Sequence, residues 1–185
     1  MNRIVALGGS NSRNSINRQF AYWAASKTGI DNVELIDLNE YEMPIYSADL
    51  EKEQGIPESV HDLREMLESA SGFVISLAEH NGNYTAVFKN ILDWLSRLDR
   101  NIWGNKPTLL LATSPGPSGG KSVLKIAKES FPYLGARVSG VYSLPAYHKN
   151  FNPKDGIVDQ GLLESFGTEM NKFDEELHRI KEVME

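Results

Sequence analysis

The sequence predicts a doubly wound α/β domain, in which a parallel five-stranded sheet carries helices on both faces. Short apolar, β-branched runs alternate along the chain with longer segments of helical period. The length of 185 residues is close to that of one domain, and 41% hydrophobic with 24% charged residues is ordinary for a globular protein. We therefore expect residues 1–185 to form a single domain.

Five short runs, bounded mostly by Gly, Asn or Pro, are the predicted strands: residues 4–7, 33–38, 73–77, 109–112 and 138–144. Between them, apolar residues recur every three or four positions, which predicts helices over residues 16–27, 57–71, 84–99 and 121–134. Such alternation is typical of βαβ units, which cross over right-handedly and cover both faces of a parallel sheet.

Two further segments each leave two interpretations open. The long connection over residues 39–55 is either an excursion that acts as a lid or a solvated loop. From about Asp159 the chain returns to helix, and its apolar stripe serves either a subunit contact or, as we favour, packing on the chain's own sheet. The stripe consists of Leu163, Phe166, Met170, Phe173, Leu177, Ile180 and Met184.

The composition excludes several classes of function. Nineteen basic against 25 acidic residues give a formal charge of −6 without a basic cluster, which disfavours nucleic-acid binding. The absence of cysteine excludes disulfides, thiolate nucleophiles and cysteine-based metal centres, and the four histidines lack metal-ligand spacing. No run is long enough for a signal peptide or a membrane span. We expect a cytoplasmic protein without a metal site.

The loop after the first predicted strand, residues 8–17, is a candidate anion site. Ligands of doubly wound sheets bind beyond the carboxyl ends of the strands, and a helix start offers free N–H groups and a positive dipole end. The hydroxyls of Ser10, Ser12 and Ser15 and the cation of Arg13 suit a terminal phosphate monoester. The alternative, a helix cap with solvent-exposed serines, is equally compatible with the sequence.

The loop after the third predicted strand, residues 78–84, is polar and contains glycine. Its backbone can pass close to a flat ligand such as an isoalloxazine ring and offer hydrogen-bonding groups to its edge. His80 is a candidate for contact with such a ring or with a substrate. Glu79 and His80 could instead be an acid and a base, although isolated neighbours of these types more often are not.

The loop after the fourth predicted strand, residues 113–122, has competing interpretations. Small residues could let its backbone contact a flavin, with the next helix directing its amino end at the ring. The main rival is a nucleophile elbow at Ser118, with Asp159 and His178 following in hydrolase order. A phosphate-binding P-loop is disfavoured, because the motif is one residue short and does not follow the first strand.

These segments, in this order, resemble the NADPH-dependent FMN reductase family, flavodoxin-like proteins that include quinone, chromate and azo-dye reductases. Residues 9–17 are similar to the family's Gly-Ser-x-Arg-x-x-Ser-x-Asn, with Ser12 at the usual arginine position and Arg13 one residue later. Residues 114–120 are similar to its Ser-x-Gly-x-x-Gly-Gly loop.

The most specific match is the middle segment, because a loop and the helix after it match together. Residues 78–82 are similar to the family's Pro-Glu-Tyr-Asn and a following small residue, with Ala78 and His80 replacing Pro and Tyr. Residues 89–94 are similar to its Lys-Asn-x-x-Asp-Trp.

The resemblance implies a flavodoxin-like sheet of strand order 2-1-3-4-5, and FMN as cofactor with NADPH or NADH as co-substrate. It places the FMN phosphate on the first loop and the ring between the other two. It also implies a homodimer or homotetramer, in which Trp94 either meets the partner or lies in the core. The implied cofactor-binding residues are Ser10, Ser12, Arg13, Ser15, Ile16, Asn17, Glu79, His80, Asn81, Gly82, Asn83, Ser114, Pro115, Gly116, Gly119 and Gly120.

The function that we predict is hydride transfer from NAD(P)H to N5 of FMN and then to a small acceptor such as a quinone. The cofactor carries this chemistry, so no catalytic base or metal is needed. The alternatives are a flavodoxin-like electron carrier, a serine hydrolase that uses Ser118, and a binding module that has lost flavin. The sequence does not specify the physiological acceptor or a preference between NADPH and NADH.

Overall fold

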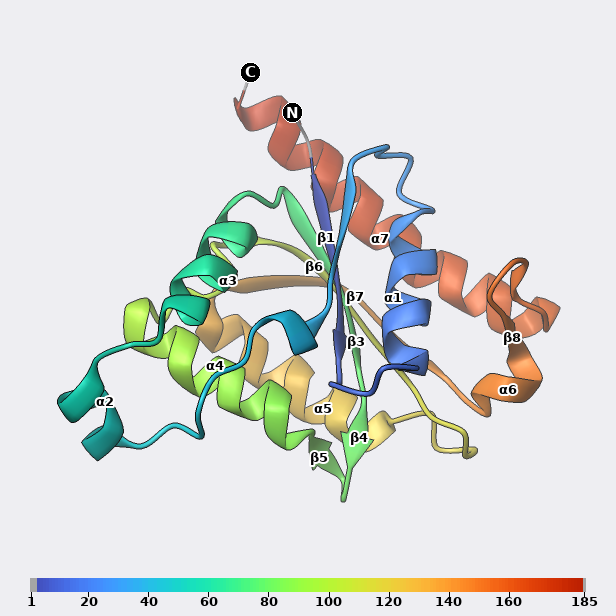
Figure 1. Cartoon of the computed structure of the whole chain (residues 1–185). Helices are drawn as coiled ribbons and strands as arrows, with labels where there is room; N and C mark the ends of the chain where they lie inside the picture. The colour runs from blue at the N-terminus through green and yellow to red at the C-terminus, as the bar shows by residue number, and fades with distance from the viewer. Residues whose placement is uncertain (1–2, 185) are drawn as a thin grey trace.

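The computed structural model describes residues 3–184, with the side chains of residues 3–179, and has a five-stranded parallel sheet at its centre (Figure 1). The strand order is β2-β1-β3-β6-β7, which is 2-1-3-4-5 when the strands of this sheet are counted in chain order. The predicted flavodoxin-like, doubly wound fold is thereby confirmed. The strands are β1 (Ile4–Gly9), β2 (Val33–Ile36), β3 (Gly72–Leu77), β6 (Lys106–Thr113) and β7 (Ala136–Leu144).

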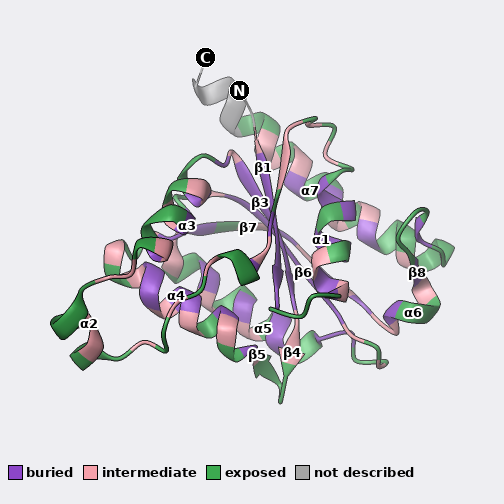
Figure 2. Ribbon diagram, viewed as in Figure 1, coloured by how far each residue is buried: buried purple, intermediate pink, exposed green. Residues whose placement is uncertain are grey.

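Helices cover both faces of this sheet (Figure 1). Helices α1 (Ile16–Ala25) and α7 (Gln160–Met184) pack on one face. The other face carries α3 (Glu58–Glu68), α4 (Ala86–Leu98) and α5 (Lys121–Ser130). Side chains of successive strand residues point to opposite faces, so the central strands are mostly apolar and are buried on both sides (Figure 2).

The element boundaries differ from the predicted ones for local reasons. Strand β6 begins at Lys106, three residues before the predicted start, because its pairing with β7 extends through this polar end. The second predicted strand ends early, since Asp37 caps the 3-10 helix η1 (Leu38–Glu40). The predicted helix 121–134 divides into α5 and the 3-10 helix η2 (Phe131–Leu134), where Pro132 lacks the N–H group that an α-helix needs.

Several short elements at the sheet edges were not predicted. A hairpin follows β3, with strands β4 (Glu79–His80) and β5 (Asn83–Tyr84). Beyond β7 lie helix α6 (Tyr147–Asn150) and a second hairpin, β8 (Phe151–Asn152) with β9 (Gly156–Ile157).

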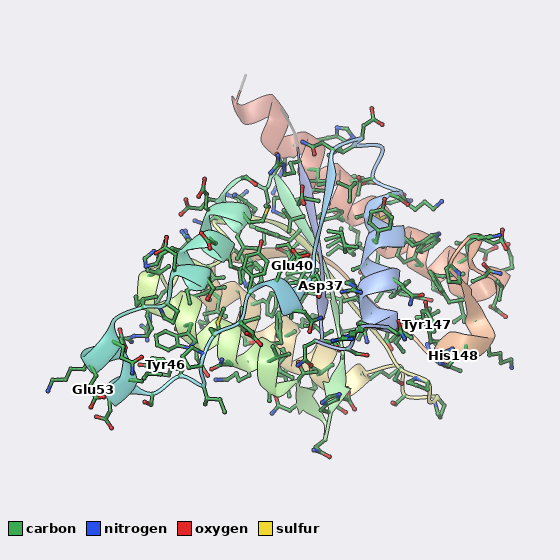
Figure 3. The ribbon with its side chains drawn as sticks, viewed as in Figure 1. Asp37, Glu40, Tyr46, Glu53, Tyr147 and His148 are labelled. Carbon is green, nitrogen blue, oxygen red and sulfur yellow. The ribbon has the colours of Figure 1, made fainter. Side chains whose placement is uncertain are left out.

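Residues 39–55 are anchored along α4, so they are not a simple solvated loop (Figure 3). The segment contains helix α2 (Ala48–Gln54). The carbonyl of Pro44 accepts hydrogen bonds from Trp94 Nε1 at 2.7 Å and from Asn90 Nδ2 at 3.0 Å, and the Tyr46 N–H donates to Asn90 Oδ1 at 2.8 Å. Trp94 is fully buried, which places it in the core of its own chain.

Helix α7 packs on its own sheet, as we favoured. Phe166, Met170 and Phe173 of the apolar stripe are buried in the core shared with α1, and Leu177 packs against it. Ile180 and Met184 lie outside the residues whose side chains are described. Within the described part of the chain, no helix has an apolar stretch that could span a bilayer.

Candidate functional site

A pocket of about 200 Å³ lies at the carboxyl edge of the sheet, where the three loops singled out in the sequence meet. Nine of its twelve lining residues belong to the implied cofactor site, and Asn14, Ala78 and Thr113 are additional. The nine are Ser10, Ser12, Ser15, Ile16, Asn17, Glu79, His80, Ser114 and Pro115. The implied residues that do not line the pocket are Arg13, Asn81, Gly82, Asn83, Gly116, Gly119 and Gly120.

The start of α1 directs hydrogen-bond donors at the pocket. Ser15 is the helix cap, because its Oγ accepts from the Arg18 N–H at 3.1 Å. This bond satisfies one of the first N–H groups of the helix and leaves those of Ile16 and Asn17, which have no partner within the helix. The first turn of α1 contains no acidic residue. The sequence left a serine helix cap and an anion site as alternative interpretations of this loop. The geometry is compatible with both at once.

Asn17 has a structural task that the sequence did not indicate. Its side chain is 3% exposed. Its Nδ2 donates to the carbonyl of Thr113 at 3.1 Å, and its Oδ1 accepts from Ser76 Oγ at 2.8 Å and from the Thr113 N–H at 3.0 Å. The side chain therefore joins α1 to β3 and β6, and the backbone N–H of Asn17 is a donor that these side-chain bonds leave free for a phosphate.

Arg18 supports the first loop, although the sequence directed attention to Arg13. The side chain of Arg13 is exposed and does not line the pocket. Arg18 donates through Nη2 to the carbonyl of Arg13 at 2.8 Å and pairs through Nη1 with Asp37 (labelled in Figure 3). Burial would raise the pKa of Asp37, but hydrogen bonds from Asn39 and the charge of Arg18 outweigh burial and lower that pKa.

The β4–β5 hairpin forms the second wall of the pocket. Its tip is a tight turn in which Asn81 and Gly82 both have positive φ, 52° and 76°. Asn81, Gly82 and Asn83 are exposed there and are not among the residues that line the pocket, so their implied contact with the cofactor stays a prediction. His80 lies at the exposed rim, while Glu79 faces inward and accepts a hydrogen bond from the N–H of Val123 in α5.

Two glycines of the third loop serve packing. A Cβ on Gly119 would lie 2.5 Å from Ser143 Oγ, and one on Gly120 would lie 2.9 Å from the Cβ of Ala112. Both glycines have positive φ, 62° and 76°. They bring the loop close to β6 and β7, and Ser114 and Pro115 are the residues of this loop that reach the pocket.

Comparison with known proteins identifies the family. Residues 2–149 match the sequence profile of NADPH-dependent FMN reductases. The chain belongs to this family. As an FMN reductase family member it is an oxidoreductase with FMN as its cofactor and NAD(P)H as its co-substrate, so the predicted class of enzyme is confirmed.

This FMN reductase is similar to several individual proteins. The chain is 33% identical over 156 residues to an uncharacterised protein of Mycoplasma pneumoniae, covering 81% of this chain and 91% of the relative. It is 31% identical over 143 residues to the quinone reductase of Escherichia coli K12, covering 76% of each chain. A flavoenzyme NAD(P)H:acceptor oxidoreductase of Paracoccus denitrificans has the same fold, with a TM-score of 0.77, 22% identity, and coverage of 97% of this chain and 98% of that one.

In the structure of this FMN reductase, the serine and the histidine of the alternative hydrolase interpretation lie far apart. Ser118 follows the carboxyl end of β6. His178 is next to Leu177, whose Cδ2 lies 2.7 Å from the Cβ position of Gly72, the first residue of β3. Because β3 and β6 are parallel, Ser118 lies near the carboxyl ends of the strands and His178 lies near their amino ends. A Ser118–His178 pair is therefore excluded.

A larger hollow on this FMN reductase, about 430 Å³, lies along α7, away from the three loops. It is lined by Asn171, Asp174, Glu175, His178 and Arg179. Burial raises the pKa of Asp174 to about 6, although the charge of His178 opposes this shift. Two carboxyl groups make the hollow a poor phosphate site, so the smaller pocket at the sheet edge is the candidate for the cofactor.

Proposed function

We propose that the pocket at the carboxyl edge binds FMN, and that the enzyme passes hydride from NAD(P)H through FMN to a small acceptor such as a quinone. The phosphate would lie at the start of α1, and the ring would lie toward β4 and the loop after β6. The observation that carries this proposal is the convergence of hydroxyl and N–H donors from the first loop on a pocket bordered by the other two.

The donors at the start of α1 suit a phosphate group. Ser12 reaches the pocket with a hydroxyl, and Ile16 and Asn17 offer backbone N–H groups at the positive end of the helix dipole. A phosphate monoester carries between one and two negative charges at neutral pH and accepts several such bonds. The first turn of α1 contains no carboxylate that would repel it.

The volume of the pocket suits the phosphate and the sugar-alcohol chain better than the whole cofactor. About 200 Å³ is below the roughly 300–1,000 Å³ of most pockets for cofactor-sized ligands. We therefore place the ring at the open mouth, beside Glu79, His80, Ser114 and Pro115. Bound there, FMN supplies acceptance and onward transfer of a hydride, and the open mouth lets NAD(P)H and the acceptor use one surface in turn.

Quinones are the acceptor class that the relatives support. The Escherichia coli relative is named a quinone reductase, and a Burkholderia relative that is 33% identical over 119 residues is named a 2-hydroxy-1,4-benzoquinone reductase. A flat acceptor can stack on an exposed ring. A one-electron carrier, the alternative, would not consume NAD(P)H when only a quinone is supplied.

We also propose that residues 1–185 form one FMN-binding domain that works as a homodimer or homotetramer in the cytoplasm. Helices of the same chain cover both faces of the sheet, which supports one domain. A second copy over the open mouth would provide the cover that this chain does not give to the ring. Sedimentation velocity measures this association, and a monomer at micromolar concentration would contradict it.

The test of the site replaces Ser12 by Ala. Loss of one hydroxyl bond to a charged phosphate should weaken FMN binding by about 10- to 150-fold, since such bonds contribute about 1.5–3 kcal/mol. The dissociation constant is measured by quenching of FMN fluorescence, and turnover by NADPH oxidation with a benzoquinone. The matched control is Ser118→Ala, which removes a hydroxyl that does not line the pocket.

Two results would contradict the proposed function. One is FMN binding that is equally strong in Ser12→Ala and the unaltered protein, because the phosphate would then lie elsewhere. The other is loss of turnover in Ser118→Ala with FMN still bound, because this serine would then take part in the chemistry.

A further inference from the structure

Glu79 joins two walls of the pocket. It lies on β4 and lines the pocket, and its Oε2 accepts a hydrogen bond from the N–H of Val123 at 3.0 Å. Val123 belongs to the first turn of α5, a helix whose N-cap, Gly120, provides no side-chain cap. The carboxylate therefore caps α5 from 44 residues away in the sequence and holds the β4–β5 hairpin against that helix.

Glu79 is also the main charge of the pocket. Among the described lining residues it is the one carboxylate, and none of them is Lys or Arg. The cation of Arg13, which the sequence placed near the phosphate, is exposed outside the lining. The dipole of α5 offsets part of the Glu79 charge, but a dipole end carries only about half a unit charge. The ring side of the pocket is thus negative.

A negative wall affects the energy of flavin reduction. A hydride carries two electrons and one proton, so its arrival adds one negative charge to the group that accepts it. A nearby carboxylate disfavours this added charge, and does so more strongly in a partly buried site than in water. The opposite process, delivery of the hydride to an acceptor, becomes correspondingly more favourable.

We propose that Glu79 is a positioning residue that holds the hairpin wall of the flavin pocket on α5 and lowers the reduction potential of bound FMN. This inference rests on the proposed function, because it requires FMN in this pocket. Reduced enzyme then gives its hydride more readily to acceptors of low potential.

The test replaces Glu79 by Gln and measures the two-electron midpoint potential of bound FMN by equilibration with a redox dye. The amide oxygen of Gln can still accept the Val123 N–H, so the wall stays in place while its charge is removed. The expected change is about tenfold in favour of the reduced form, a shift of about 30 mV to more positive potential for a two-electron couple. FMN affinity should change by less than about threefold, since the phosphate donors are untouched.

Two further variants separate charge from structure. Glu79→Asp keeps the charge on a shorter side chain, so its potential should stay near that of the unaltered protein even if the hairpin loosens. Glu129→Gln removes a carboxylate from the exposed, far end of α5 and should leave the potential unchanged. An unchanged potential in Glu79→Gln, or an equal shift in Glu129→Gln, would overturn the proposal.

The FMN titration of the unaltered protein is done first. If that protein binds no FMN, the proposed function fails and this inference fails with it. If it binds FMN and only the potentials contradict expectation, the proposed function stands and the role of Glu79 is wrong.

Discussion

Asn17 shows how one residue can match a binding motif and serve the fold at the same time. Its side chain forms three hydrogen bonds with Ser76 and Thr113, both of which are buried. Loss of these bonds would leave polar groups of two strands without partners inside the protein, where each such group costs about 1–3 kcal/mol. Asn17 thus determines where the helix start, with its N–H groups, lies relative to the sheet.

The corresponding prediction concerns stability. Asn17→Ala should lower the free energy of unfolding by about 2–4 kcal/mol, because three buried hydrogen bonds disappear together. Urea denaturation followed by circular dichroism measures the loss. The control is Asn11→Ala, an exposed position in the same loop, which should stay within about 0.5 kcal/mol of the unaltered protein. Equal stabilities of the two variants would show that the Asn17 bonds are unimportant.

At the level of elements, the pocket depends on the loops that end three neighbouring strands. The β4–β5 hairpin was predictable, since Asn-Gly is the strongest short-range indication of a two-residue hairpin turn, and positions 81 and 82 adopt the positive φ that such a turn needs. The loop after β6 was located correctly, and the assignment of its glycines to the cofactor stays a prediction. Two of them also permit close approach of the loop to β6 and β7.

These glycines give the second prediction. Gly119→Ala places a methyl group 2.5 Å from Ser143 Oγ at a residue of positive φ, so we expect a loss of about 2–3 kcal/mol in stability and weaker FMN binding. The matched control is Gly116→Ala in the same loop, where the nearest atom to the new Cβ is 3.9 Å away. Thermal melting and FMN titration of both variants measure the difference. A Gly119→Ala protein as stable as Gly116→Ala would refute this account of the loop.

At the level of the whole molecule, α7 closes one face of the sheet and carries a carboxyl group that opposes folding when ionised. Burial raises the pKa of Asp174 from 3.8 to about 6, and among the described residues its Oδ1 has no hydrogen-bond partner. A raised pKa in the folded state means that the folded protein binds the proton more tightly than the unfolded one. The contribution of Asp174 to stability therefore falls as pH rises from about 4 to about 6, and stays low above that range.

The third prediction follows from this direction of the pH dependence of stability. Asp174→Asn should raise the free energy of unfolding at pH 7.5 by about 1 kcal/mol, after allowance for solvent screening of a partly exposed group, and should flatten its decline between pH 4 and 6. The control is Glu175→Gln, an exposed neighbour on α7. Unfolding curves from pH 4 to 8 test the prediction. A variant that is less stable than the unaltered protein at pH 7.5 would contradict it.

The sequence by itself determined the five strands of the main sheet, the helices between them, the family, and the three loops that hold the candidate site. These features depend on periodicity and short motifs, which act within a few residues of the chain. The roles of individual residues within these loops were harder to predict from the sequence. Arg13 and Arg18 are both arginines near the same helix start, and only the position of Asp37, directly after β2, makes Arg18 the one that supports the loop.

Only the tertiary structure decided how distant segments meet. It joined Asn17 to β3 and β6, brought the side chain of Glu79 against the first turn of α5, and anchored residues 39–55 on α4. The physical reason is that a hydrogen-bond partner 44 or 96 residues away becomes a neighbour only through the packing of helices on the sheet. No local pattern contains that information, because it belongs to the geometry of the whole fold.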